Sequence, residues 1–392
     1  MLRSRFLLQI EITLDLVLYS ALVAVAQPGL AAAASGPFAS KFQVWVNNHA
    51  MAGAVFLVAT KEKILDEEAV GYSDLATKTP MSIDDEFWIA SMTKPITAAA
   101  LMMLVDEGKV SIDDPVEKYL PEFKGQMVEG ANGGPPLPPT HPILIREILS
   151  HTSGLANLPD DLTLPLSQRV SSYAHSLLET QPGTHFRYVN AGINTVGRII
   201  EVVSGMPYEK FVQERILIPL GMSDTTFWPD AGQITRLAAA YQEAPDNTGL
   251  EKVANPFVPD PGKPRVYVLP AGGLFSTAAD LLKFCRMMLQ QGVFEGKRYL
   301  SQSSVAAMTK LYTTPTTGGS YGLAWMISPN SFYHDGAFKT RMAIVPSEGL
   351  VEIFLVQISK PLPAGADQFI NIFTRTAEES FGEQSTPAVA PH

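Results

Sequence analysis

The chain has 392 residues, 46% of them hydrophobic and only 17% charged, a composition that supports a large buried core and excludes a disordered chain. Its formal net charge of -10 comes from 39 acidic against 29 basic residues and argues against a nucleic-acid partner. The single cysteine, Cys285, excludes an intramolecular disulfide. It lies in an apolar helical pattern, where we expect a buried, inert thiol.

Residues 1–34 have the pattern of a secretory signal peptide. Arg3 and Arg5 precede an apolar stretch at 16–26, and small residues suited to cleavage follow at 31–34. The apolar stretch is shorter than the about 20 residues that span a bilayer. We therefore expect a secreted or periplasmic protein with no stable membrane anchor after cleavage.

Two acidic residues in this leader support a different interpretation. Glu11 and Asp15 are unusual in a signal peptide, because charged carboxylates oppose insertion into a membrane. A start codon assigned too far upstream is the alternative explanation for this segment.

Both ends of the remaining chain predict β-strands. Residues 54–59 and 64–72 form two β-rich segments around a charged turn, which is typical of an antiparallel hairpin. Residues 342–345 and 350–358 form a second such pair, and 368–381 has the pattern of a closing helix. Strands at both ends predict one antiparallel sheet, with the middle of the chain inserted into it.

The middle of the chain is mainly helical. The expected helices are 96–107, 143–149, 194–203 and 278–289. Two proline-rich stretches, 125–142 and 229–270, are expected to be irregular loops.

The domain organisation follows from this order of elements. We expect one domain of the α/β class, more closely α+β, over 35–385. Its sheet part covers about 40–90 and 320–382, and its helical part about 96–310.

A Ser-x-x-Lys pattern at Ser91 and Lys94 directly precedes the strongest predicted helix. Pro95 limits where this helix can begin, because proline is tolerated only within about the first turn. Residues three apart on a helix face the same way, about 5–6 Å apart at Cβ, so the Lys94 ammonium can reach the Ser91 hydroxyl. Alone the pattern is weak, since a serine N-cap followed by a surface lysine is a common helix start.

A second pattern is Tyr188-Val189-Asn190. A phenol with a pKa of about 10 is a poor base at neutral pH, but a neighbouring ammonium such as that of Lys94 would stabilise the phenolate. The Asn190 carboxamide can hold the lysine or a substrate amide. By itself, this segment also fits a buried aromatic residue before a helix cap.

A third pattern is His334-Asp335-Gly336-Ala337, on a strand that enters the C-terminal pair. Gly336 allows the backbone to approach a ligand closely. The Ala337 N–H would pair with the Ser91 N–H as an oxyanion hole, with two fixed donors where a tetrahedral intermediate gains charge. In isolation this pattern is no more than an ordinary turn.

In this order, the three patterns resemble those of the class C β-lactamase, D,D-carboxypeptidase and β-lactamase-like (family VIII) serine esterase superfamily. Further stretches at 148–155, 270–277 and 321–325 are similar to the same superfamily, so the resemblance covers roughly residues 40 to 380. It implies a β-lactamase/transpeptidase-like fold, in which an antiparallel sheet from both chain ends is flanked by helices and carries an inserted, mainly helical domain.

The resemblance also implies a mechanism. Ser91 would attack a carbonyl carbon after giving its proton to Lys94 and Tyr188, forming an acyl-enzyme, and Tyr188 would then protonate the leaving group. No metal or organic cofactor is implied. The residues that the resemblance assigns to substrate binding are Asn190, His334, Gly336 and Ala337.

The third pattern departs from that of strict β-lactamases, which carry Lys-Thr-Gly where this chain has His334-Asp335-Gly336. Histidine, with an unperturbed pKa of about 6.5, is mostly neutral at pH 7 and should bind a substrate carboxylate weakly. Lys339 and Arg341 are close enough in sequence to compensate, unless strand alternation points them elsewhere. Alternatively, Asp335 points into the site and repels anions. The pattern favours an esterase or a peptidase.

The expected substrate is a small ester, amide or β-lactam, or a peptidoglycan peptide. We expect carboxylesterase-like activity ahead of D,D-peptidase or weak β-lactamase activity. A non-catalytic homologue that binds peptidoglycan or a partner is a further alternative, against which the intact Ser91, Lys94 and Tyr188 argue. His151, within His-Thr-Ser-Gly, is expected to be structural.

Overall fold

The computed structural model describes residues 36–258 and 267–382. The expected signal peptide, 1–34, lies outside the described residues, and its assignment stays a prediction. Within the described ranges, no helix is both long enough and apolar enough to cross a bilayer.

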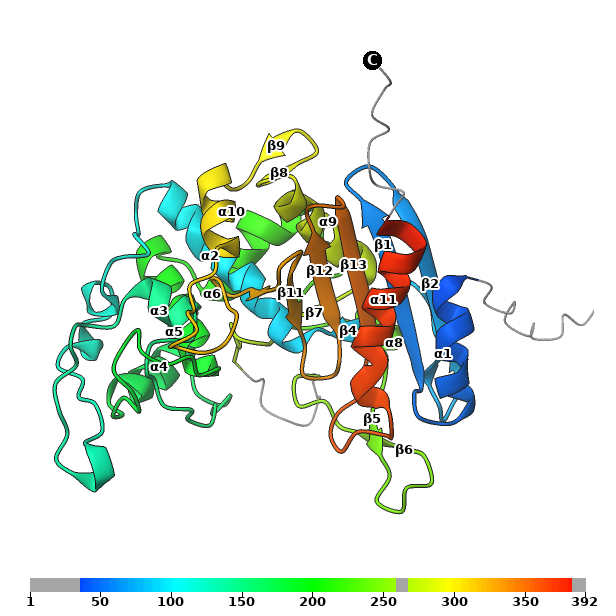
Figure 1. Ribbon diagram of the computed structural model, residues 1–392, viewed down its shortest axis with the longest axis horizontal. Helices are drawn as coiled ribbons and strands as arrows, with labels where there is room; N and C mark the ends of the chain where they lie inside the picture. The colour runs from blue at the N-terminus through cyan, green and yellow to red at the C-terminus, as the bar shows by residue number, and fades with distance from the viewer. Residues whose placement is uncertain (1–35, 259–266, 383–392) are drawn as a thin grey trace, which may run out of the picture. The chain divides into compact units, whose positions relative to one another are not determined.

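Strands from the two ends of the described chain form one antiparallel sheet (Figure 1). Its strands are β1 (Gly53–Thr60), β2 (Ile64–Asp74), β3 (Thr79–Pro80), β10 (Met326–Ile327), β11 (Phe332–Asp335), β12 (Arg341–Val345) and β13 (Leu350–Val356). They are ordered β10-β11-β12-β13-β1-β2-β3. Ala54 lies opposite Val356 and Thr60 opposite Leu350, so β1 joins the two chain ends. Both predicted strand pairs are confirmed.

The alternation of side chains on β1 divides the core into two layers. Phe56 and Val58 pack on one face of the sheet, and Val55 and Leu57 pack on the other. All four side chains are fully buried. A central strand covered on both faces is continuously apolar, which is the pattern that made it recognisable in the sequence.

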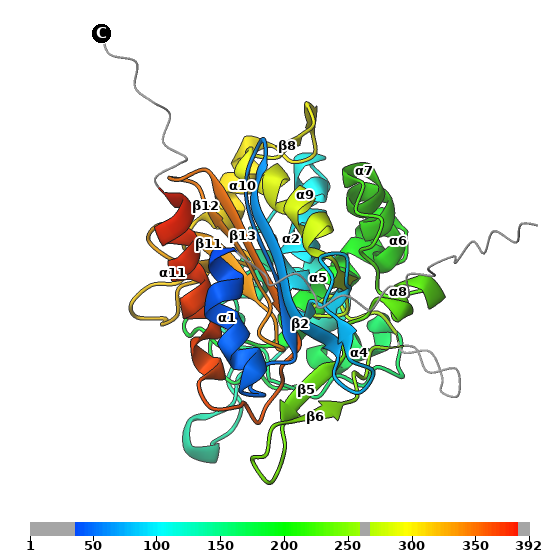
Figure 2. The ribbon, with the colours of Figure 1, turned by 90° about the vertical axis from the view of Figure 1, so that its right-hand side faces the viewer.

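Helices α1 (Pro37–Asn47) and α11 (Phe369–Phe381) cover one face of the sheet (Figure 2). An aromatic cluster fills this layer, with ring centroids 5.2 Å apart for Phe38 and Phe56, 5.3 Å for Phe56 and Phe354, and 5.4 Å for Phe354 and Phe373. The closing helix was predicted, whereas α1 was not.

The opposite face of the sheet packs against the helical part of the chain. Helix α9 contacts β1, β12 and β13, and α2 is buried along most of its length. Cys285 on α9 is buried, as expected. The helices are α2 (Thr93–Asp106), α3 (Ile145–Leu149), α4 (Leu166–Ala174), α5 (Asn190–Ser204), α6 (Tyr208–Val212), α7 (Ile218–Leu220), α8 (Ala231–Thr235), α9 (Ala278–Leu289) and α10 (Gln302–Thr309).

Part of the stretch expected to be irregular is ordered. Within 229–270, α8 is followed by a hairpin of β5 (Ala240–Glu243) and β6 (Leu250–Val253). The remaining short pairs are β4 (Phe87–Trp88) with β7 (Phe275–Ser276), and β8 (Val293–Phe294) with β9 (Lys297–Arg298).

Helix α5 begins at Asn190 and not at the expected residue 194, so Gly192 lies inside it. Glycine lowers helix propensity, so the sequence pattern placed the start after it. The structure shows why glycine is accepted here: a Cβ at Gly192 would lie 2.8 Å from the Ile148 carbonyl oxygen. The close packing of α3 on α5 therefore outweighs the local preference.

The aromatic layer predicts a stability effect. Phe56→Ala removes a ring that contacts Phe38 and Phe354, and should lower the free energy of unfolding by about 3–5 kcal/mol. Urea unfolding followed by circular dichroism measures this change. Val44→Ala, at a side chain that is 50% exposed on α1, is the control and should change stability by no more than about 0.5 kcal/mol. Equal effects of the two substitutions would contradict this account of the core.

Candidate active site

Ser91 lies in a tight turn between β4 and α2. A short 3-10 helix, Ala90–Met92, continues directly into α2, so Ser91 is at the start of the helix and partly exposed. Ala90 has a φ of 46°, a left-handed conformation that costs a non-glycine residue about 1–2 kcal/mol. Strain of this kind persists only where the surroundings fix the backbone, and here it directly precedes the candidate nucleophile.

The Lys94 amine is fully buried and reaches three oxygen atoms. Its Nζ lies 2.9 Å from Ser91 Oγ, 3.0 Å from Asn190 Oδ1 and 2.7 Å from the Ala271 carbonyl oxygen. Burial lowers its pKa to about 7, against the opposing charge of Asp160. A neutral amine has two N–H groups and one lone pair. With Asn190 and Ala271 accepting the two N–H groups, the lone pair points to Ser91.

Tyr188 lies against both of these residues. The Lys94 Nζ is 4.7 Å from the centre of the Tyr188 ring, and the Tyr188 hydroxyl forms a hydrogen bond with Ser91. Desolvation raises the pKa of Tyr188, and the Ser91 hydrogen bond only partly offsets this effect. The expected phenolate is therefore corrected to a neutral phenol, because desolvation and the negative charge of Asp335 both oppose ionisation of the hydroxyl.

Ala271 is a member of the site that the sequence patterns did not assign. Its carbonyl accepts from Lys94, and its N–H donates to Asn194 Oδ1 at 3.1 Å. The Asn194 amide in turn donates to Asp160 at 2.8 Å. Residues 270–277 were recognised only as similar to the superfamily, which was the available signal for this position.

The third pattern lies close to the Ser91 turn. A Cβ at Gly336 would be 2.6 Å from the Ile89 carbonyl oxygen, so only glycine permits this approach. Ala337 follows in the turn between β11 and β12, is exposed, and donates no backbone hydrogen bond within the described chain. Its N–H is free to serve a substrate, and the oxyanion hole with Ser91 stays a prediction.

His334 requires a correction. The side chain is fully buried, with Nε2 2.8 Å from the Tyr321 hydroxyl and Nδ1 2.8 Å from the Asp335 carbonyl oxygen. Burial and the positive charge of Lys94 lower its pKa to about 3. With both nitrogens paired and no exposed surface, this neutral imidazole does not present a positive charge to a substrate carboxylate.

The charges around His334 are paired on the other face of the sheet. Arg341 binds Asp335 through two hydrogen bonds of 2.6 and 2.9 Å. Arg341 lies opposite Phe354, whose ring belongs to the layer under α11, so strand alternation points Arg341 away from Ser91. Lys339, in the turn after Ala337, is partly exposed.

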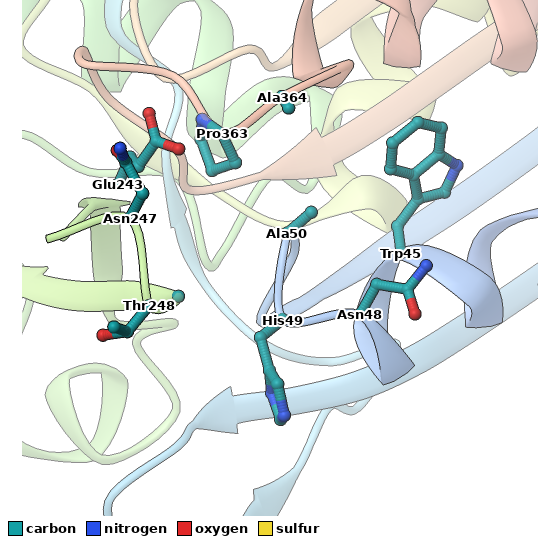
Figure 3. Close-up of a pocket in the computed structure, with 10 residues that line it drawn as sticks. Trp45, Asn48, His49, Ala50, Glu243, Asn247, Thr248, Pro363 and Ala364 are labelled. Atoms are coloured by element: carbon teal, nitrogen blue, oxygen red, sulfur yellow. The ribbon is translucent and has the colours of Figure 1, made fainter.

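A pocket with a volume of about 350 Å³ lies away from Ser91 (Figure 3). Trp45 and His49 line one side of it, and Glu243, Asn247 and Thr248 of the β5–β6 hairpin line the other. None of the residues around Ser91 contributes to it. The candidate active site is therefore assigned on the contacts of Lys94, not on this pocket.

Comparison with known proteins agrees with the fold. Residues 30–376 match the family model described as Beta-lactamase, so the chain belongs to the Beta-lactamase family. The fold is the β-lactamase/transpeptidase-like fold, as expected.

Relatives within this family have peptidase and esterase names. The chain is 27% identical over 305 residues to the D-alanyl-D-alanine-carboxypeptidase/endopeptidase AmpH of Escherichia coli, covering 71% of this chain and 72% of AmpH. It is 28% identical over 263 residues to Esterase EstB of Burkholderia gladioli, covering 59% and 64%. The solved structure of EstCE1, a hydrolase with promiscuous acyltransferase activity, aligns with a TM-score of 0.73 at 22% identity, covering 87% of this chain and 97% of EstCE1.

The buried amine predicts the pH dependence of activity. Lys94 accepts a proton only when neutral, so kcat/KM for a neutral ester should rise with pH through about 7 and fall about tenfold per unit below it. A pH series from about 5 to 9 measures this limb.

Glu352→Gln is the control for this limb. Burial raises the pKa of Glu352 to about 8. The residue lies on β13 and has no hydrogen bond to Ser91, Lys94 or Tyr188 within the described chain. The limb should be unchanged in this variant. A limb that disappears in Glu352→Gln would contradict the assignment to Lys94.

Proposed function

We propose that the chain is a serine hydrolase that cleaves carboxylic esters through an acyl-enzyme on Ser91. The observation that carries this proposal is the Lys94 amine, which lies 2.9 Å from Ser91 Oγ and is held by two further acceptors. A base whose pKa is about 7 is suited to take a proton at neutral pH.

The first half of the reaction acylates the serine. The Ser91 proton moves to neutral Lys94 as Oγ attacks the carbonyl carbon, and the developing oxyanion accepts hydrogen bonds from the N–H groups of Ser91 and Ala337. The tetrahedral intermediate collapses by breaking the bond to the leaving alkoxide. The Lys94 ammonium returns its proton through the Tyr188 hydroxyl to that alkoxide, which departs as an alcohol.

The second half releases the acid. A water molecule gives a proton to neutral Lys94 through Tyr188 and attacks the acyl carbon. Collapse of the second intermediate breaks the bond to Ser91 Oγ, which takes the proton back. Water is consumed, one carboxylic acid is formed, and the site returns to its starting protonation.

The third motif favours neutral esters over substrates that carry a carboxylate. His334 is neutral and Arg341 is paired with Asp335 on the opposite face. A charge-assisted hydrogen bond is worth about 1.5–3 kcal/mol, so a carboxylate-bearing substrate loses that contribution here. The esterase name of the relative EstB supports the same preference.

A D,D-peptidase is the second candidate, and Lys339 is the observation that favours it. This lysine lies two residues after Ala337 in the turn between β11 and β12 and is partly exposed. An ammonium there is able to contact a substrate carboxylate near the oxyanion hole. The peptidase name of AmpH supports this alternative.

We also propose that the protein acts outside the cytoplasm. The basic residues Arg3 and Arg5 and the apolar stretch at 16–26 support secretion. Fractionation of the producing cells, with the N-terminal residue of the protein determined in each fraction, decides this point, since protein confined to the cytoplasm with an uncleaved leader would contradict it.

A fluorophosphonate probe should form one adduct, on Ser91, located by mass spectrometry of the digested protein. Ser91→Ala should abolish both the adduct and ester hydrolysis, at a cost in stability of no more than about 1 kcal/mol. Ser223→Ala is the matched control at an exposed serine, and should keep wild-type activity. An adduct on any other residue would show that the nucleophile is assigned wrongly.

A substrate panel separates the two candidates. A short-chain aryl ester should be hydrolysed with kcat/KM at least about tenfold above that for a chromogenic cephalosporin or a D-Ala-D-Ala peptide. Lys339→Ala should lower kcat/KM for all three by similar small factors. A selective loss of peptide hydrolysis in Lys339→Ala would favour the peptidase instead.

A further inference from the structure

His151 lies among the residues of the site, yet no step of the proposed reaction uses it. Its side chain is buried, and its ring centre lies 4.4 Å from that of Tyr188 and 4.9 Å from that of Tyr321. Its φ of 59° is in the left-handed region, which non-glycine residues rarely adopt. A strained, buried histidine beside a reactive side chain is more than a packing residue requires.

The backbone on both sides of Tyr188 is hydrogen bonded to this one residue. The Arg187 N–H donates to the His151 carbonyl oxygen at 2.8 Å, and the Val189 N–H donates to His151 Nδ1 at 3.3 Å. The imidazole ring also lies against the Tyr188 ring, with the two ring centres 4.4 Å apart. His151 therefore holds the Tyr188 segment at three points.

The acceptor role of Nδ1 requires a neutral ring with its proton on Nε2. Burial and the nearby positive charge of Lys94 lower the pKa of His151 well below its usual value, so the ring stays neutral. The bond to Val189 is then present throughout the pH range in which Lys94 changes its protonation.

We propose that His151 is a positioning residue that holds the Tyr188 hydroxyl in place for proton transfer at Ser91. The proposal rests on the proposed function, in which Tyr188 carries the proton. Misplacement of a reacting group by about 1 Å can lower the rate about 10²-fold. Because the contacts of His151 position Tyr188 and do not touch the substrate, we expect them to affect kcat and not substrate binding.

Two substitutions at His151 form a matched pair. Glycine and asparagine both tolerate a positive φ, but only asparagine keeps an acceptor, Oδ1, near the position of Nδ1. His151→Gly should lower kcat for the aryl ester about 10²-fold with KM changed less than about threefold. His151→Asn should recover about tenfold of that loss. Circular dichroism and thermal unfolding show whether each variant is folded.

The same substitutions in a Tyr188→Phe background separate positioning from packing. Without the hydroxyl there is nothing left to position, so His151→Gly and His151→Asn should each change kcat by less than about threefold there. If His151→Gly does not fold, the His151→Asn pair alone carries this comparison. Equal losses in both backgrounds, or His151→Asn no better than a folded His151→Gly, would overturn the proposal.

Failure of the proposed function gives a different result. Near wild-type turnover of Tyr188→Phe itself would remove Tyr188 as the proton carrier, whatever His151 does. A slow Tyr188→Phe together with near wild-type His151→Gly and His151→Asn would overturn only the role of His151.

Discussion

The rest of the site depends on one constraint, which is the direction of the lone pair on the buried Lys94 amine. Lys94 is buried on α2, and its partners come from the start of α5 and from the loop that contains Ala271. Both elements must keep their acceptor atoms within hydrogen-bond distance of Lys94 Nζ, because a shift of either acceptor would turn the amine away from Ser91. The dense packing of α2 against α5, with Gly192 allowing α3 to approach α5, supplies this accuracy.

Local patterns made much of the fold predictable, and distant contacts explain what was missed. The continuous apolar runs of β1 and β13 and the helix after Pro95 are read from neighbouring residues. The spacing of Ser91 and Lys94 is local too, so their contact was expected. The neutrality of His334 depends on Tyr321 and on burial, which no short pattern records.

The same reasoning explains why the proposed role of His151 is not visible in the sequence. Its motif lies at a helix end, where a structural role is the ordinary interpretation. Only the folded chain brings its carbonyl and ring to the two sides of Tyr188. The two buried histidines and Tyr188 are all neutral, so Lys94 is the group in this cluster that changes its charge near pH 7.

The pairing of β1 with β13 has a consequence for biosynthesis. The ribosome releases β1 early, but its neighbour emerges only after almost the whole chain has been made. Until then, the edge of β1 that later pairs with β13 has no hydrogen-bond partner, and the turn with Ala337 does not yet exist near Ser91. A nascent chain is therefore aggregation-prone and without a complete site, and both conditions end together when the final strands dock.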